Sequence, residues 1–230
     1  MATISHHWRT SEYLTEKEFH KADDLMNKGD FTKVISIFLA KIDELKDNNE
    51  LIMWVAYDLG CIYYMNDDFE NSALSFKKSV ELFGSSSSPA FAGVAREYAM
   101  VLKDLNQWNE AIKFYKKAKN ILLKYWYDEE SPVDFAVFQT EMAESYRNLG
   151  MLDEALENCL EAKKIMMDEN KVKHYVYTEI LNCLGEIHMD FKKKDEALLF
   201  FNEALSILNK TEETILINRL TSNIAKANNI

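Results

Sequence analysis

Apolar residues recur at intervals of three and four along most of this chain, and short polar stretches interrupt them. This spacing places apolar side chains on one face of a helix. The stretch AESYRNLGMLDEALENCLEAKKI, residues 143–165, adds small residues at Ala143, Gly150, Ala155 and Ala162. Small side chains are needed where two helices cross closely, and glycine is favoured in a turn that requires a positive φ. The pattern therefore predicts closely packed pairs of helices.

The same arrangement recurs about every forty residues. Alignment of the stretch that begins at Ala92 with the one that begins at Ala136 pairs the following residues: Ala99 with Ala143, Ala111 with Ala155, Tyr115 with Cys159, and Ala118 with Ala162. In this frame the repeats begin near Thr15, Met53, Ala92, Ala136 and Thr178. Spacings of 38 to 44 residues between these starts predict an array of helical hairpins.

This pattern resembles the tetratricopeptide repeat, a helix-turn-helix unit with small residues where its two helices cross. The resemblance implies an all-α fold, a right-handed α-solenoid of about five repeats with a C-terminal capping helix. The expected organisation is an N-terminal tail, residues 1–12, an array over 13–211 and a cap over 212–230. The repeats lie near 15–48, 53–86, 92–125, 136–169 and 178–211. The first departs from the pattern, with Val34 and Lys41 where alanine is expected. In the cap, the stripe Ile215, Ile217, Leu220 and Ile224 is expected to cover the last repeat.

Composition narrows the class of protein. The 230 residues include only two prolines and six glycines, and the formal net charge is −11, which argues against a nucleic-acid-binding surface. The most apolar stretch, residues 51–65, is shorter than the roughly 20 apolar residues that a membrane span needs. Three cysteines without a CxxC motif favour reduced thiols and a cytoplasmic location.

No sequence motif for catalysis is present. The five histidines lack the spacing of metal ligands, and the chain has no phosphate-binding loop, dinucleotide fingerprint or nucleophile elbow. His188 and Cys159 are expected in the core, while Cys61 and Cys183 could face a groove. We therefore predict no enzymatic activity, no metal and no cofactor. An enzyme would require an unrecognised cluster of polar residues.

The resemblance also implies where a partner binds, because the first helix of each repeat lines the concave side in this family. Projected onto this chain, the predicted groove residues are Trp54, Tyr57, Tyr64, Arg96, Lys103, Glu144, Arg147, Asn148, Asn182 and Glu186. Such a surface suits an extended or helical peptide, since aromatic side chains supply anchors and the polar ones supply hydrogen bonds. Phe19 and Asp23 stand where the chaperone-binding members carry a carboxylate clamp, so we do not expect recognition of chaperone C-termini.

Two functions fit this surface. The first is a scaffold or adaptor that binds a segment of a partner protein. The second is a sensor of small peptides, since repeats of about forty residues are similar to those of kinesin light chains and bacterial peptide-pheromone receptors. Those receptors carry an output domain ahead of their repeats. Only about a dozen residues precede the first repeat here, which favours the adaptor. The expected partner is a protein or peptide, not nucleic acid or membrane. The sequence also leaves open a homodimer that forms through Phe19 and Phe38.

Overall fold

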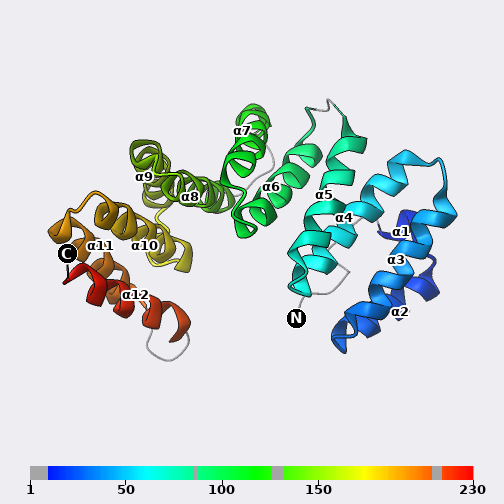
Figure 1. The fold of residues 1–230 in the computed structure, drawn as a ribbon, viewed down its shortest axis with the longest axis horizontal. Helices are drawn as coiled ribbons and strands as arrows, with labels where there is room; N and C mark the ends of the chain where they lie inside the picture. The colour runs from blue at the N-terminus through cyan, green and yellow to red at the C-terminus, as the bar shows by residue number, and fades with distance from the viewer. Residues whose placement is uncertain (1–9, 85–86, 126–131, 209–213, 230) are drawn as a thin grey trace. The chain divides into compact units, whose positions relative to one another are not determined.

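The fold of the chain is all-α, as the periodicity predicts. The computed structural model describes residues 10–84, 87–125, 132–208 and 214–229, and within these ranges every regular element is a helix (Figure 1). The helices are α1 (Thr10–Tyr13), α2 (Glu16–Asn27), α3 (Phe31–Leu45), α4 (Asn49–Met65), α5 (Phe69–Phe83), α6 (Pro89–Asp104), α7 (Trp108–Tyr125), α8 (Pro132–Asn148), α9 (Leu152–Asp168), α10 (Tyr175–Asp190), α11 (Lys194–Ile207) and α12 (Thr214–Ala227). The expected class of helical-repeat fold is confirmed.

The helices fall into two compact units, Met1–Lys124 and Tyr125–Ile230. In the first unit α2 packs against α3 and α4 against α5, while α4 also contacts α3 and α6 contacts α5. In the second unit α8 pairs with α9 and α10 with α11; α10 also contacts α8 and α9, and α12 contacts α10 and α11. Tyr98 of α6 also meets Phe114 of α7 at 4.7 Å. In each hairpin of two successive helices, from α2 and α3 to α10 and α11, we call the first helix the A helix and the second the B helix.

The small residues of the sequence pattern lie where the two helices of a hairpin cross. Ala99, Ala111, Ala143 and Ala155 are all fully buried. At Gly60 even a methyl group would not fit, because an added Cβ would lie 2.8 Å from the ring of Phe76. These positions set how closely the helices approach.

The turn between the A and B helices has the same backbone conformation in all five hairpins. The residues with a positive φ are Gly29, Asp67, Asn106, Gly150 and Lys192. In each hairpin the next residue donates its backbone N–H to a carbonyl five residues earlier, at 2.8 to 3.0 Å. This is the hydrogen bond of a Schellman motif, which satisfies a carbonyl at the helix end. Gly150, with φ 74°, has the conformation that its type indicates.

The end of the predicted N-terminal tail, residues 1–12, lies in a short helix. Residues 1–9 of the predicted tail lie outside the described residues, but Thr10–Tyr13 form α1. Tyr13 is buried and its ring meets Phe38 edge-on at 6.2 Å. The suggestion that Phe38 could mark an exposed dimer seam is therefore wrong, because its side chain is fully buried.

Two further expectations about exposure are wrong. Ile215 does not cover the last repeat, since 88% of it is exposed, whereas Leu220 and Ala227 of α12 are fully buried. Leu220 lies five positions after Ile215, and at about 100° per residue this places the two side chains about 140° apart around the helix. Cys183 is also buried rather than directed to a groove. In both cases the rotation of the helix, which the apolar pattern fixes only loosely, decides exposure.

Candidate functional site

The predicted groove residues of the first unit lie on α4 and α6. Trp54 is the most buried of them, at 8% exposure, and its ring meets Tyr57 at 6.1 Å and Phe83 at 5.5 Å, edge-on in both cases. Phe83 in turn meets Phe91 of α6 at 5.8 Å. Trp54 thus belongs to an aromatic cluster inside the unit. Its side chain packs beneath the surface of the unit and contributes little exposed area.

Tyr57 lies beside a small polar group on α4 and α6. Burial raises the pKa of its hydroxyl, the negative charge of Glu97 adds to this shift, and the positive charge of Arg96 opposes it. The ring of Tyr57 also meets Phe76 at 5.6 Å. Tyr57 and Arg96 are each half-buried, so a partner can reach both. The structure therefore brings these two predicted residues together on adjacent A helices.

In the last turn of α4 a hydrogen bond joins the same two helices. The hydroxyl of Tyr64 donates to the carboxylate of Asp104 at 2.9 Å, and its ring lies 5.4 Å from Phe69. Lys103, next to Asp104, is half-buried. We call the surface of these side chains the α4/α6 face, and its members are Tyr57, Tyr64, Arg96, Lys103 and Asp104.

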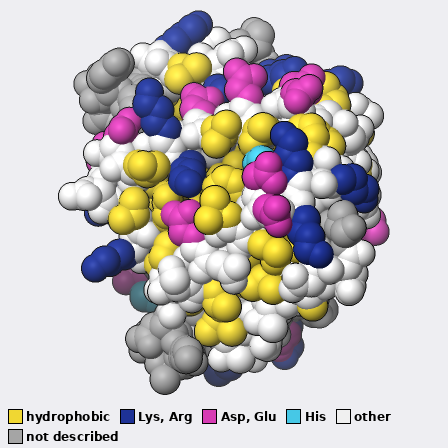
Figure 2. All heavy atoms as spheres, turned by 90° about the vertical axis from the view of Figure 1, so that its left-hand side faces the viewer, with side chains coloured by type: hydrophobic (Ala, Val, Ile, Leu, Met, Phe, Trp, Pro, Cys, Tyr) yellow, Lys and Arg dark blue, Asp and Glu magenta, His cyan; other side chains and the backbone are white. Residues whose placement is uncertain are grey.

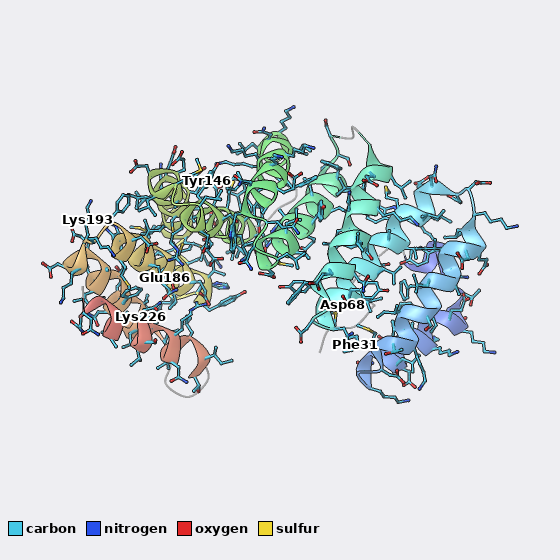
Figure 3. The ribbon with its side chains drawn as sticks, in the orientation of Figure 1. Phe31, Asp68, Tyr146, Glu186, Lys193 and Lys226 are labelled. Atoms are coloured by element: carbon cyan, nitrogen blue, oxygen red, sulfur yellow. The ribbon has the colours of Figure 1, made fainter. Side chains whose placement is uncertain are left out.

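In the second unit the corresponding residues form a connected polar network. Arg147 of α8 forms ion pairs with two carboxylates of α10, Glu186 at 3.0 Å and Asp190 at 3.2 Å. Glu186, labelled on α10 in Figure 3, uses its other oxygen to accept hydrogen bonds from Asn182 at 3.2 Å and Asn223 of α12 at 2.9 Å. The carboxylate of Glu186 therefore joins three helices.

The network extends along α12. The amide of Asn223 also donates to the side-chain oxygen of Asn182 at 3.0 Å, and Arg219 pairs with Glu179. Burial lowers the pKa of Arg219, and the charge of Glu144 on α8 acts in the opposite direction. Asn182 is only 4% exposed as a result of this packing. We call the surface the α8/α10/α12 face, and its members are Glu144, Arg147, Asn148, Glu179, Asn182, Glu186, Asp190, Arg219 and Asn223.

Two of the predicted residues lie at the surface of α8. Asn148 is exposed and donates its side-chain amide to the carbonyl of Glu144, one turn earlier on α8, at 2.8 Å. Glu144 itself is half-buried. Both residues therefore lie at the surface of α8, where a partner can reach them.

The links between successive A helices join residues about one repeat apart. Tyr64 and Asp104 are 40 residues apart, Arg147 and Asp190 are 43, Glu179 and Arg219 are 40, and Asn182 and Asn223 are 41. By this measure α12 occupies the place of the A helix of a sixth repeat. Arg219 and Asn223 are not among the predicted groove residues, and the signal that would have found them is this spacing, continued into the capping helix.

Burial disfavours the charged forms of Cys183 and His188. Contact with Cys159 and burial raise the pKa of Cys183 well above its usual range, which disfavours the reactive thiolate. His188 lies near the rings of Phe191 and Phe200, and burial lowers its pKa. Among the residues that the structure describes, no group of His, Cys, Asp and Glu could hold a metal ion, and no helix is long and apolar enough to cross a membrane.

Comparisons with known proteins agree with this architecture. Residues 134–210 match the family model of the tetratricopeptide repeat. Among curated protein sequences none matches the chain. The expected resemblance to tetratricopeptide-repeat proteins, kinesin light chain repeats included, is confirmed.

Solved structures with similar folds share little sequence. The kinesin light chain-like repeats of Podosopora anserina superpose with a TM-score of 0.70 at 16% identity, over 86% of this chain and 96% of that chain. YrrB, described as having an unusual peptide-binding site, gives 0.63 at 15%, over 95% and 97%. MamA of Desulfovibrio magneticus RS-1 gives 0.66 at 12%, over 86% and 97%. At these identities the similarity concerns the fold.

Proposed function

We propose that this protein is a non-catalytic scaffold or adaptor that binds a segment of a partner protein on its A-helix faces. The observation that carries the proposal is the set of links between successive A helices, which hold polar and aromatic side chains in place on each face. A preorganised surface loses less conformational entropy when a partner binds. The tetratricopeptide-repeat match over 134–210 supports the same class of function.

The two faces contribute differently in this proposal. On the α4/α6 face, half-buried Tyr57, Tyr64, Arg96 and Lys103 contact the partner directly, and buried Trp54 holds the helices beneath them. This combination of aromatic rings and cations suits a segment with apolar side chains and carboxylates.

On the α8/α10/α12 face most of the predicted contact residues already pair with other side chains of the unit. Glu144, Arg147, Asn148 and Glu186 meet the partner through their exposed atoms. Asn182, covered by α12, acts as a positioning residue. Figure 2 shows the side of the molecule that lies at the left in Figure 1. Hydrophobic side chains on that side lie among Lys, Arg, Asp and Glu side chains, and neither sign of charge covers a large area. On that side, such interleaving favours contact with a mixed protein segment over a polyanion.

The test is quantitative affinity capture from the source cells with three variants. Arg96→Ala/Lys103→Ala alters the α4/α6 face, and Arg147→Ala alters the other face. Lys77→Ala/Lys113→Ala is the control, because these two exposed lysines lie on the B helices α5 and α7. All variants are first checked for unchanged helical circular dichroism.

A protein that is captured by wild type and the control but lost with one face variant supports the adaptor, and its purified segment should bind that variant about tenfold more weakly. If the face variants retain every protein but lose a co-purifying short peptide, the sensor function is correct instead. If neither face variant changes what is captured, the proposed faces are wrong.

A further inference from the structure

A pocket on the first hairpin shares no residue with either proposed face. Its volume is about 370 Å³, and it lies between α2 and α3, with Lys21 of α2 and Ile37 of α3 among the residues that line it. This is near the lower end of the roughly 300–1,000 Å³ range of ligand pockets. Ile37 is half-buried, so the pocket offers apolar surface to whatever enters it.

The base of the pocket departs from the pattern of the other hairpins. Lys41 stands at the position occupied by Ser79, Ala118, Ala162 and Ala204 in the later B helices, and all five are buried. A buried ammonium group is stable only when it is paired. Lys41 meets this need with two carboxylates of the pocket wall, Glu18 at 3.1 Å and Glu44 at 2.7 Å. The long side chain thus brings charge to a place where the other hairpins carry a small neutral residue.

Charge is unevenly distributed along the pocket. Glu18, Lys41 and Glu44 together carry one negative charge at the end formed by the start of α2 and the end of α3. Lys21 lies one turn further along α2, and Lys33 lies in the first turn of α3, the helix that begins at Phe31 (labelled in Figure 3). Lys33 pairs with Asp30 at 2.5 Å, whereas Lys21 forms no ion pair within the described part of the chain. Lys33 and Glu44 are about 16 Å apart along the helix.

We propose that this pocket binds a short extended segment of a partner protein that carries an acidic residue at one end, apolar residues in the middle and a basic residue at the other end. The carboxylate pairs with Lys21 and Lys33, the apolar side chains lie on Ile37 and the alkyl part of Lys21, and the cation pairs with Glu18 and Glu44. A span of 16 Å corresponds to about five extended residues, at roughly 3.3 Å each. The occupant is thus distinct from that of either A-helix face.

The test uses the peptide acetyl-Glu-Ala-Leu-Ala-Lys-amide, in which the Glu, Leu and Lys side chains all point to one side of an extended chain. It is added to the intact, isotope-labelled protein, and NMR chemical shifts are the measurement. The expected result is a saturable change confined to amides of α2 and α3. Peptides with Glu or Lys at both ends should bind about fivefold more weakly, because each loses one charge pair. If no saturable change occurs there, or if the changes fall on α4 and α6, the proposal is overturned.

Two pairs of charge reversals locate the binding. Lys21→Glu/Lys33→Glu should weaken binding about tenfold or more, because an attraction becomes a repulsion. Lys77→Glu/Lys113→Glu makes the same change in net charge at exposed lysines on α5 and α7, and should leave the affinity unchanged. If both pairs of substitutions weaken peptide binding equally, the effect is one of net charge, and the proposed binding at this pocket is wrong. The reversed residues are exposed, so both variants should fold, which circular dichroism checks.

Discussion

Glycines inside these helices differ sharply in what surrounds them. An added Cβ at Gly185 would overlap the ring of Phe201, whereas at Gly93, in α6, it would meet nothing within 4 Å. Gly185→Ala should therefore destabilise the protein by roughly 1–3 kcal/mol through overpacking. Gly93→Ala should stabilise it by about 0.5–1 kcal/mol, because alanine favours the helix. Urea unfolding of both variants measures the difference, and equal effects would show that the close crossing at Gly185 is absent.

The capping box of α2 makes stability depend on pH. Backbone hydrogen bonding from Thr15, at 2.8 Å, lowers the pKa of Glu18; burial opposes the shift, and the Thr15 hydroxyl and Lys41 reinforce it. A carboxyl whose pKa is lower in the folded state stabilises the protein above its unfolded pKa, near 4.5, and loses that contribution as pH falls through the folded value. Glu18→Gln should therefore have a lower free energy of unfolding than wild type at pH 7, and this difference should disappear at acidic pH. Urea unfolding at several pH values measures it. A difference that stays constant between pH 7 and 3 would show that the Glu18 carboxylate does not stabilise the fold in this way.

At the scale of elements, α12 is attached to its unit by both apolar and polar contacts. Its buried residues are Leu220, Asn223 and Ala227. Asn223→Ala would leave the buried oxygen of Asn182 without this donor, at a cost of about 1–3 kcal/mol. Hydrogen exchange should then accelerate in α12 by roughly tenfold or more.

Asn218→Ala is the matched control for α12, because this asparagine lies on the exposed side of the same helix. It should leave exchange in α12 nearly unchanged. If Asn223→Ala also leaves hydrogen exchange unchanged, the hydrogen bond from Asn223 to Asn182 does not stabilise α12 on α10. The control separates the loss of a particular contact from the general effect of alanine on an exposed helix.

For the whole molecule, the two compact units should respond separately to damage. Ala111 of α7 and Ala155 of α9 are both fully buried at helix crossings, one in each unit. Replacement of either by arginine should cost about 3 kcal/mol or more, by overpacking and by burial of a charge. In helical repeats each hairpin contacts mainly its neighbours. Hydrogen exchange should therefore accelerate most in the unit that carries the substitution, and uniform acceleration across both units would contradict this view.

The all-α fold, the period near forty residues and the small residues at helix crossings could be predicted from the sequence. These features depend on contacts within one hairpin, and the geometry of a helix relates them directly to spacing along the chain. The positive φ at Gly150 follows for the same reason, although Lys192 shows that the turn imposes this conformation even on a residue that disfavours it.

Only the tertiary structure decided which polar residues stay available to a partner. Asn182 has the groove position of its repeat, yet α12 covers it, and Trp54 lies in an aromatic cluster. Arg147 is engaged by two carboxylates of the next A helix. Exposure depends on the rotation of each helix and on the side chains that neighbouring hairpins contribute. The pattern of one repeat does not contain that information, because the contacts that decide exposure join residues about forty positions apart in the sequence.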